Sequence, residues 1–404
     1  MHGRLRILPF IILGLIVLLE VYAYFGFKST VQAYSPGLGN TVYGIYFFFM
    51  ALSVISLLII FSTGNRLSKS FRNFLFAGVF INLFSLLTFD IFALLDDVRR
   101  LGFAVFQAND LTRSSMLISI GLVIAAIPNV LLLLGMFIGP YRYRVKETTI
   151  HLPNLPTSFE GLKIVQISDI HSGSFYNKKA VNKGVDMVLD QKPDVVFFTG
   201  DLVNDDATEM SPYKEIFSRI KAPLGVFSIL GNHDYGDYVQ WPSEAAKAQN
   251  LEDLKAVHGD LGWRLLLNEH LYLEKNKEQI GLIGVENWGV GFHKVGDLPK
   301  AYEGCQAPVK LLLSHDPTHW DEEVTKAYQD IDVTFSGHTH GAQMGFEIGK
   351  YKWSPITLRY KKWAGLYQLK NQYMYINRGF GFLGYPGRLG IWPEVSVIRL
   401  TAKR

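Results

Sequence analysis

Five short clusters in this chain hold the kinds of side chain that bind metal ions and activate water. Two clusters contain Asp-x-His and His-x-His pairs, in which alternate residues of an extended segment point the same way and can reach one site together. The others contribute an aspartate, an Asn-His-Asp run and a histidine. The clusters are Ser168-Asp169-Ile170-His171, Gly200-Asp201, Gly231-Asn232-His233-Asp234, Ser314-His315-Asp316 and Ser336-Gly337-His338-Thr339-His340.

The mixture of imidazole, carboxylate and amide groups indicates which metal ions these clusters suit. Such ligands favour Mn, Fe or Zn, whereas Ca prefers a shell made only of oxygen atoms. The single cysteine, Cys305, excludes an intramolecular disulfide and a cysteine-based zinc site. The candidate metal ligands are Asp169, His171, Asp201, Asn232, His315, His338 and His340.

Each cluster directly follows a short apolar run, which predicts a buried strand. In α/β sheets, ligand sites gather beyond the carboxyl ends of strands, so these strands would bring all five clusters to one rim. One such pair alone would be an incidental surface feature or a turn, but five in this order indicate a metal site. Gly200, Gly231 and Gly337 are expected to allow the sharp turns that expose the ligands.

The remaining pattern from about residue 145 onward is that of an α/β domain. A helix is predicted over Asn177–Gln191, where Val181, Val185 and Val188 recur at helical spacing. The predicted strands are Leu162–Gln166, Asp194–Phe198, Gly225–Ile229, Ile280–Val285, Val309–Leu313, Asp332–Phe335, Tyr373–Ile376 and Val395–Leu400.

The first 140 residues are dominated by apolar side chains. Four runs approach the roughly 20 residues that a helix needs to cross a bilayer. The first run follows Arg4 and Arg6 as a signal peptide would, but three further spans and the lack of a small-residue cleavage site favour a retained helix. We predict a transmembrane region over 1–140 and a catalytic domain over 145–404. The predicted spans are Ile7–Phe25, Val42–Phe61, Phe74–Leu95 and Met116–Ile138.

Basic residues near the ends of the spans predict the orientation. Eight lie on the side that carries the amino terminus and the segment after the fourth span: Arg4, Arg6, Arg66, Lys69, Arg72, Arg142, Arg144 and Lys146. Four lie on the other side, partly offset by acidic residues: Lys28, Arg99, Arg100 and Arg113, with Asp96, Asp97 and Asp110. This bias places both termini and the catalytic domain in the cytoplasm, with the spans in a bacterial inner membrane.

Two acidic residues, Glu20 and Asp90, fall within or at the edge of the spans. An ionisable residue inside a membrane is a candidate for function, although packing inside a helix bundle is the alternative. The formal net charge of +4 comes without a basic stripe interleaved with aromatics, so no nucleic-acid partner is expected. The sequence indicates no oligomeric state.

The sequences of the clusters are similar to the motifs of the calcineurin-like metallophosphoesterase superfamily. SDIHSG, GDLV, GNHD, SGHTHGAQ and the late NRGFG most resemble its bacterial membrane-associated branch of the YkuE type, over about residues 160–400. This resemblance implies a β-sandwich flanked by helices, in a four-layer αββα arrangement, behind the four-helix transmembrane region.

The resemblance also implies two divalent metal ions, with Mn favoured, and a role for each candidate residue. Asp201 would bridge the ions, and a hydroxide held between them would attack phosphorus. His233 would contact the phosphate or protonate the leaving group, and Asp234 would orient His233. The first ion would be held by Asp169, His171 and His340, and the second by Asn232, His315 and His338.

The chain departs from phosphoprotein phosphatases at one catalytic position. Those enzymes continue Gly-Asp with a further Asp that supports the catalytic histidine, whereas Asn204 stands here. The resemblance therefore leaves the support of His233 open, with Asp205 as a substitute. Arg378 and Arg388 lie where the family carries loops near the substrate, and each is either a phosphate ligand or a structural arginine.

The expected function is hydrolysis of a phosphoester or pyrophosphate bond in a lipid-linked or membrane-proximal substrate, with the lipid bilayer as the chain's other partner. The four spans motivate that substrate class. The alternatives are the same chemistry on soluble phosphomonoesters or nucleotides, an inert membrane receptor or scaffold, and transport through the helices.

Overall fold

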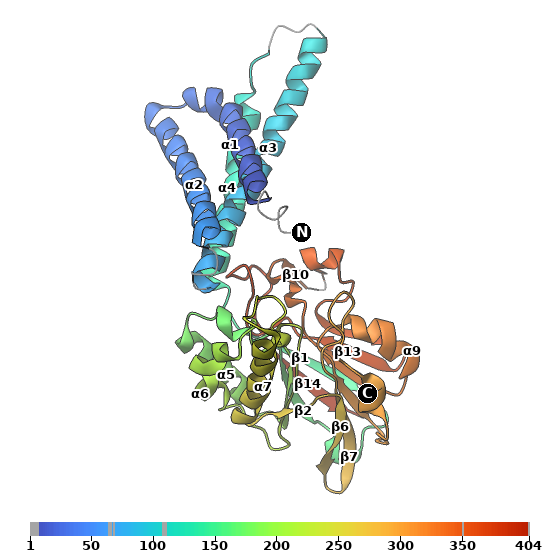
Figure 1. Ribbon diagram of the computed structural model, residues 1–404. Coiled ribbons are helices and arrows are strands. Elements are labelled where there is room, and N and C mark those ends of the chain that lie inside the picture. Colours follow the sequence, from blue (N-terminus) through green and yellow to red (C-terminus); the bar gives the residue numbers. More distant parts are fainter. Residues whose placement is uncertain (1–7, 64–66, 68, 107–110, 350, 403–404) are drawn as a thin grey trace. The chain divides into compact units, whose positions relative to one another are not determined.

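The computed structural model describes residues 8–63, 67, 69–106, 111–349 and 351–402 (Figure 1). Arg4, Arg6, Arg66 and Asp110, which entered the orientation argument, lie outside these residues. The chain divides into two compact units, Met1–Phe137 and Ile138–Arg404.

The amino-terminal unit is made of four long helices, α1 (Leu8–Gln32), α2 (Pro36–Thr63), α3 (Lys69–Val105) and α4 (Ser115–Ile138). Within the described residues, all four are long and apolar enough to cross a membrane. A helix suits that setting because it satisfies its backbone hydrogen bonds internally. The predicted four spans are confirmed, although α3 continues well past the expected end.

Close packing and ion pairs hold these helices together. A Cβ atom on Gly121 of α4 would lie 2.7 Å from the side chain of Phe92, so a small residue is needed where α3 and α4 meet. The polar end of α3 is closed by ion pairs, with Arg99 2.9 Å from Asp96 and Arg113 3.4 Å from the same carboxylate. These pairs explain how α3 extends beyond its apolar run.

Two mixed six-stranded sheets form the centre of the carboxy-terminal unit. The first has the order β1 (Arg144–His151), β14 (Glu394–Thr401), β2 (Lys163–Ile167), β3 (Val195–Thr199), β4 (Val226–Ile229) and β5 (Arg264–Leu265). The second has the order β12 (Gly365–Leu369), β13 (Gln372–Ile376), β9 (Val333–Ser336), β8 (Lys310–Leu313), β7 (Glu278–Gly284) and β6 (Glu269–Lys275). A hairpin of β10 (Phe346–Ile348) and β11 (Tyr351–Trp353) stands apart from both.

The sheets pack face to face and helices cover their outer faces. Phe197 of β3 and Phe335 of β9 meet edge to face in the buried layer between the sheets, with ring centroids 5.1 Å apart. Helices α5 (Lys178–Asp190), α6 (Lys214–Phe217) and α7 (Glu244–Asp260) cover the first sheet. Helix α8 (Leu298–Tyr302) and the helical segment Trp320–Val324, which continues into α9 (Thr325–Ala327), cover the second. This arrangement confirms the expected four-layer αββα fold.

The strands that line the site were all predicted, while several edge strands were not. The pairs β2–β3, β3–β4, β7–β8 and β8–β9 are all parallel, so β2, β3 and β4 end at one edge of their sheet, and β8 and β9 at one edge of theirs. The edge strand β12 is uncharged but half-exposed, whereas β1, β6 and the hairpin lie at edges or outside the sheets and carry charged side chains, as exposed edges commonly do. Their sequences therefore lack the apolar run that marks a central strand.

Helix α7 contains a histidine whose substitution should stabilise this unit. His258 is fully buried against Trp263, and neither ring nitrogen has a hydrogen-bond partner among the described residues. We expect His258→Leu to raise the free energy of unfolding at pH 7 by about 1–3 kcal/mol, because an unsatisfied polar group leaves the core. Tryptophan fluorescence can follow urea unfolding of the solubilised chain, since all seven tryptophans lie in this unit.

The advantage of that variant should grow in acid. Burial lowers the pKa of His258 to about 3, so below the usual histidine value the unfolded chain binds a proton that the folded chain does not. The wild type therefore loses up to about 1.4 kcal/mol per pH unit from this residue between about pH 6.5 and 3. His270→Leu, which removes a histidine already bonded to the Ala301 carbonyl, serves as the control. A wild type as stable as His258→Leu at pH 5 would contradict the prediction.

Candidate metal centre

The five predicted clusters meet at the carboxyl ends of their strands. Six of the side chains form two buried or half-buried groups, each compact enough to hold one ion. Each group draws on both sheets, because its ligands follow strands of both. The first group is Asp169, His171 and His340, and the second is Asp201, His315 and His338.

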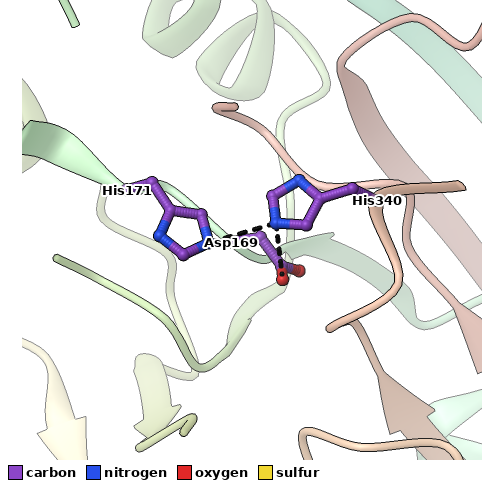
Figure 2. Close-up of side chains that lie close together, drawn as sticks. All are labelled: Asp169, His171 and His340. Carbon is purple, nitrogen blue, oxygen red and sulfur yellow. Dashed lines mark hydrogen bonds and ion pairs between the residues drawn. The ribbon is translucent and has the colours of Figure 1, made fainter. Parts of the chain in front are cut away.

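In the first group, three side chains converge on one point between β2 and β9 (Figure 2). His171 Nε2 and His340 Nε2 are 3.0 Å apart, and Asp169 Oδ1 lies 3.3 Å from His340 Nε2. Two imidazole nitrogens this close must share either a proton or a cation. With a carboxylate beside them, they offer a mixed N/O set that suits Mn, Fe or Zn.

The second group is arranged in the same way. His338 Nδ1 lies 3.3 Å from His315 Nε2, which in turn lies 3.1 Å from Asp201 Oδ2. The side-chain oxygen of Asn232 is buried and has no hydrogen-bond partner in the described part of the chain, while its amide nitrogen donates to the Tyr238 hydroxyl at 2.8 Å. An amide held by its nitrogen with a free oxygen fits the expected amide ligand.

Asp201 connects the two groups. Its Oδ2 atom lies 3.1 Å from His315 Nε2 in the second group and 3.5 Å from His171 Nε2 in the first. Its Oδ1 atom accepts the backbone N–H of His233 at 2.9 Å. One carboxylate oxygen therefore faces both candidate ion positions, as a bridging ligand must.

The backbone at the site is strained. Asp169, His171, Asp201, His338 and His340 all have φ between 47° and 69°, in the left-handed region that residues other than glycine seldom adopt. Each such residue costs of order 1–3 kcal/mol and persists where the surrounding structure enforces it. Five such residues among seven candidate ligands indicate that the fold gives up stability to aim these side chains.

Burial and mutual charge set the protonation of the ligands. Burial lowers the pKa of His171 to about 3, which keeps that imidazole neutral and able to bind a cation. Burial also raises the pKa of Asp169 to about 6. Burial opposes ionisation of Asp201 as well, but the adjacent histidines, His315 above all, hold its pKa well below the usual range.

Hydrogen bonds from outside the groups fix the imidazole rings. His315 Nδ1 donates to the Thr199 carbonyl at 2.7 Å, which leaves Nε2 free to bind an ion. His338 Nε2 lies 2.8 Å from the Tyr360 hydroxyl, which leaves Nδ1 facing the group. Partners of this kind orient metal-binding histidines in general. Tyr360 was not identified from the sequence, because it lies in a loop 20 residues beyond the last cluster.

His233 adjoins both groups and belongs to neither. Its ring centroid is 5.0 Å from that of His171, and its Nδ1 donates to the backbone carbonyl of Asn204 at 2.9 Å. Tyr238 packs over the ring with centroids 4.3 Å apart. The support of His233 left open by the sequence therefore comes from a main-chain atom, and the Asp205 carboxylate instead accepts from the backbone of Tyr238.

The contacts of Asp234 differ from the role expected for it. Asp234 does not touch the His233 ring: its carboxylate accepts backbone N–H groups of Gly231 and Leu202 at 2.8 Å and of Asp201 at 2.9 Å. Asp234 thus ties two ligand-bearing loops together. This network of main-chain contacts carries no signature in the sequence, apart from the position of Asp234 directly after the histidine.

Both arginines are engaged by groups of the protein itself. Arg378 is enclosed between Glu347 and Glu394 in ion pairs. Arg388 is fully buried, and it donates to the Gly381 carbonyl at 2.9 Å and lies 3.2 Å from His340 Nδ1. These contacts favour the alternative structural role for both arginines over phosphate binding.

The glycines next to the ligands are required for two different reasons, the backbone angle and the lack of room for a side chain. Gly200 has φ of 94°, as a sharp turn requires, but Gly231 and Gly337 do not have positive φ. A Cβ atom on Gly337 would lie 1.9 Å from Ser168 Oγ and 2.3 Å from Asp169 Oδ2. The Gly337 position therefore admits no side chain because the Asp169 carboxylate occupies that space.

We expect Gly337→Ala to weaken metal binding by about 10- to 100-fold, since it displaces the Asp169 carboxylate. Manganese titration monitored by calorimetry on the chelator-treated, solubilised chain measures this. Gly259→Ala, at a helical glycine with open space around it, is the matched control and should bind as the wild type does. Equal affinities in all three proteins would contradict this account of Asp169.

Comparisons with known proteins agree with this geometry. Residues 162–342 match the model of the calcineurin-like phosphoesterase family, and residues 4–140 match that of a probable calcineurin-like phosphoesterase transmembrane domain. The chain therefore carries a calcineurin-like phosphoesterase domain and the transmembrane domain of probable calcineurin-like phosphoesterases. Its combination of a four-helix transmembrane domain with the phosphoesterase domain is the one expected from the sequence.

Proteins similar to this chain occur in animals and bacteria. Proteins described as "Transmembrane protein with metallophosphoesterase domain" are 30% identical in Bos taurus and 28% in Danio rerio, over 63% and 64% of this chain. The chain spans 57% of the length of each of these two relatives. The uncharacterized metallophosphoesterase YkuE of Bacillus subtilis is 26% identical over 66% of this chain and 88% of its own length.

Proposed function

We propose that this chain is a membrane-anchored hydrolase that uses two divalent metal ions to cleave a phosphoester or pyrophosphate bond. The observation that carries the proposal is the position of Asp201 Oδ2, within 3.5 Å of a histidine from each ligand group. A shared carboxylate between two three-residue groups is what a dinuclear site needs. All seven expected ligands are present, which argues against an inert receptor or scaffold.

The donor sets favour Mn, Fe or Zn, with Mn as the first ion to test. When bound, two such ions lower the pKa of a shared water so that hydroxide forms near neutral pH, and they offset charge on the phosphate. Asp169, His171 and His340 would hold one ion, Asn232, His315 and His338 the other, and Asp201 both.

The chain's own contribution to the reaction lies in His233. Because Nδ1 donates to the Asn204 carbonyl, the free nitrogen is Nε2, and the ring is held in place by Tyr238. His233 Nε2 would then hydrogen-bond a phosphate oxygen or deliver a proton to the leaving-group oxygen. Asp234 fixes the two loops that carry His233 and Asp201, so their relative position is set before substrate arrives.

The substrate we propose is lipid-linked or membrane-proximal. Four membrane-spanning helices in the same chain support this class, because a soluble substrate requires no such anchor. We also propose that the catalytic unit faces the cytoplasm. The excess of basic residues on the side of the amino terminus supports this, with eight there against four, Lys28, Arg99, Arg100 and Arg113, on the other side.

A comparison of substrates tests the proposal. The purified full chain with manganese should hydrolyse bis(4-nitrophenyl) phosphate, and it should turn over a lipid-linked pyrophosphate faster than a soluble nucleotide. A truncated chain of residues 138–404 should lose that preference while keeping the aryl phosphoesterase activity. An equal preference with and without the helices would contradict a lipid-linked substrate. The absence of metal-dependent hydrolysis of every substrate would contradict the proposed enzymatic activity.

A further inference from the structure

A cavity of about 440 Å³ lies within the membrane-spanning unit, and all four helices contribute to its wall. Most of the wall is apolar, with Phe27 of α1 and Phe89 of α3 among the residues that line it. This volume falls within the roughly 300–1,000 Å³ typical of sites for small molecules. Its size and lining suit a hydrocarbon chain.

One side of the cavity is polar, and each side-chain amide nitrogen there donates a hydrogen bond within the unit. Asn82 Nδ2 donates to Glu20 Oε1 at 2.9 Å, and Asn129 Nδ2 donates to Ser85 Oγ at 2.9 Å. All four residues line the cavity. Asn82 and Ser85 are three residues apart on α3, so they face the same way, and they hold Glu20 and Asn129 about one helical turn apart.

Two buried acceptors on this side have no partner among the described residues. They are Glu20 Oε2 and Asn129 Oδ1. Glu20 is only 3% exposed, and no lysine, arginine or histidine in the described part of the unit pairs with it. A carboxylate in such surroundings is costly unless a donor or a cation meets it. The group that is missing is therefore a hydrogen-bond donor, and a positively charged donor would neutralise the carboxylate as well.

We propose that this cavity binds an amphiphile that carries an ammonium group on a hydrocarbon chain. The ammonium group has three N–H donors, which meet Glu20 Oε2 and Asn129 Oδ1, and the hydrocarbon chain lies along Phe27 and Phe89. A neutral long-chain alcohol offers one donor and no positive charge. A fatty-acid carboxylate offers no donor, and its negative charge would repel Glu20. This site is separate from the metal centre, and the proposal does not depend on the phosphoesterase activity.

Photolabelling of the full chain in phosphatidylcholine nanodiscs tests the site. The probe is dodecylamine with a diazirine on its chain, and labelled peptides are located by mass spectrometry. We expect saturable labelling in α1, α3 and α4 that unlabelled dodecylamine prevents and dodecanol does not. Non-saturable labelling spread over the lipid-facing surface, or equal competition by dodecanol, would overturn the proposal.

Variants then tie the binding to the charge on Glu20. Glu20→Gln should lower saturable labelling by about tenfold or more, because a hydrogen bond to a charged group is lost. Asp90→Asn is the matched control: Asp90, on α3, is another buried carboxylate of the membrane-spanning unit, but it does not line the cavity, and its replacement should leave labelling unchanged.

A compensating double variant guards against simple misfolding. In Glu20→Gln with Asn129→Asp, the carboxylate moves to the other free acceptor position of the same cavity, and saturable labelling should return. Full labelling of the Glu20→Gln single variant would contradict the proposal, and so would a double variant that folds but stays unlabelled.

Discussion

Replacing Asp201 with Asn is expected to abolish hydrolysis and to empty both ion positions at once. An amide cannot supply the negative charge that two cations share, and Oδ2 of Asp201 faces a histidine of each ligand group. Since a two-metal site contributes several kcal/mol to the stabilisation of the transition state, kcat should fall by about a thousandfold or more. The backbone N–H of His233 keeps an acceptor in the variant, so the fold should survive.

Metal analysis and turnover of bis(4-nitrophenyl) phosphate on the same preparation measure this effect. Asp260→Asn, at an exposed aspartate whose partner is Lys214, gives a matched change of charge away from the site. It should retain wild-type metal content and activity. An Asp201→Asn protein that keeps two ions and near-normal turnover would rule out the bridging role.

The second large effect is expected for His233→Ala, which should lower kcat by about 10²- to 10⁴-fold while both ions remain bound. The two results together separate the roles: His233 lies beside the ligand groups but belongs to neither. The loss should be greater for an alkyl phosphoester than for a 4-nitrophenyl ester, because an alkoxide leaving group needs the proton more.

His270→Ala is a suitable control, since that histidine lies on the edge strand β6 and bonds to the Ala301 carbonyl. It should have no effect on either ester. If His233→Ala lost both metal ions, or slowed the two esters equally, His233 would be a structural or metal-binding residue and not a proton donor.

The ligand set could be predicted from the sequence because each ligand follows a strand that the sequence also marks. Asp169, Asp201 and His315 come directly after buried apolar runs, and parallel strands end at a common edge. The roles of the more distant residues could not be predicted in this way. Whether Arg378 faces a substrate or Glu394 depends on how loops close over one another, and the local sequence does not encode that packing.

The support of His233 is a second feature that the sequence could not predict. The sequence shows Asn204 where relatives in the phosphoprotein phosphatase branch have an acid, which suggests that a contact is lost. In the structure the Asn204 carbonyl accepts from His233 Nδ1, and every residue type has that atom. The edge strands β1 and β6 escaped prediction for a related reason, since their charged, half-exposed residues lack the apolar pattern of a central strand.

The dinuclear account is tested most directly by counting the ions that activity requires. The solubilised full chain would be stripped with a chelator and titrated with manganese, and bound ions and hydrolysis of bis(4-nitrophenyl) phosphate would be measured at each step. We predict little activity with one ion bound per chain and full activity with two. Full activity at one ion per chain, or activity that does not depend on metal, would contradict the account.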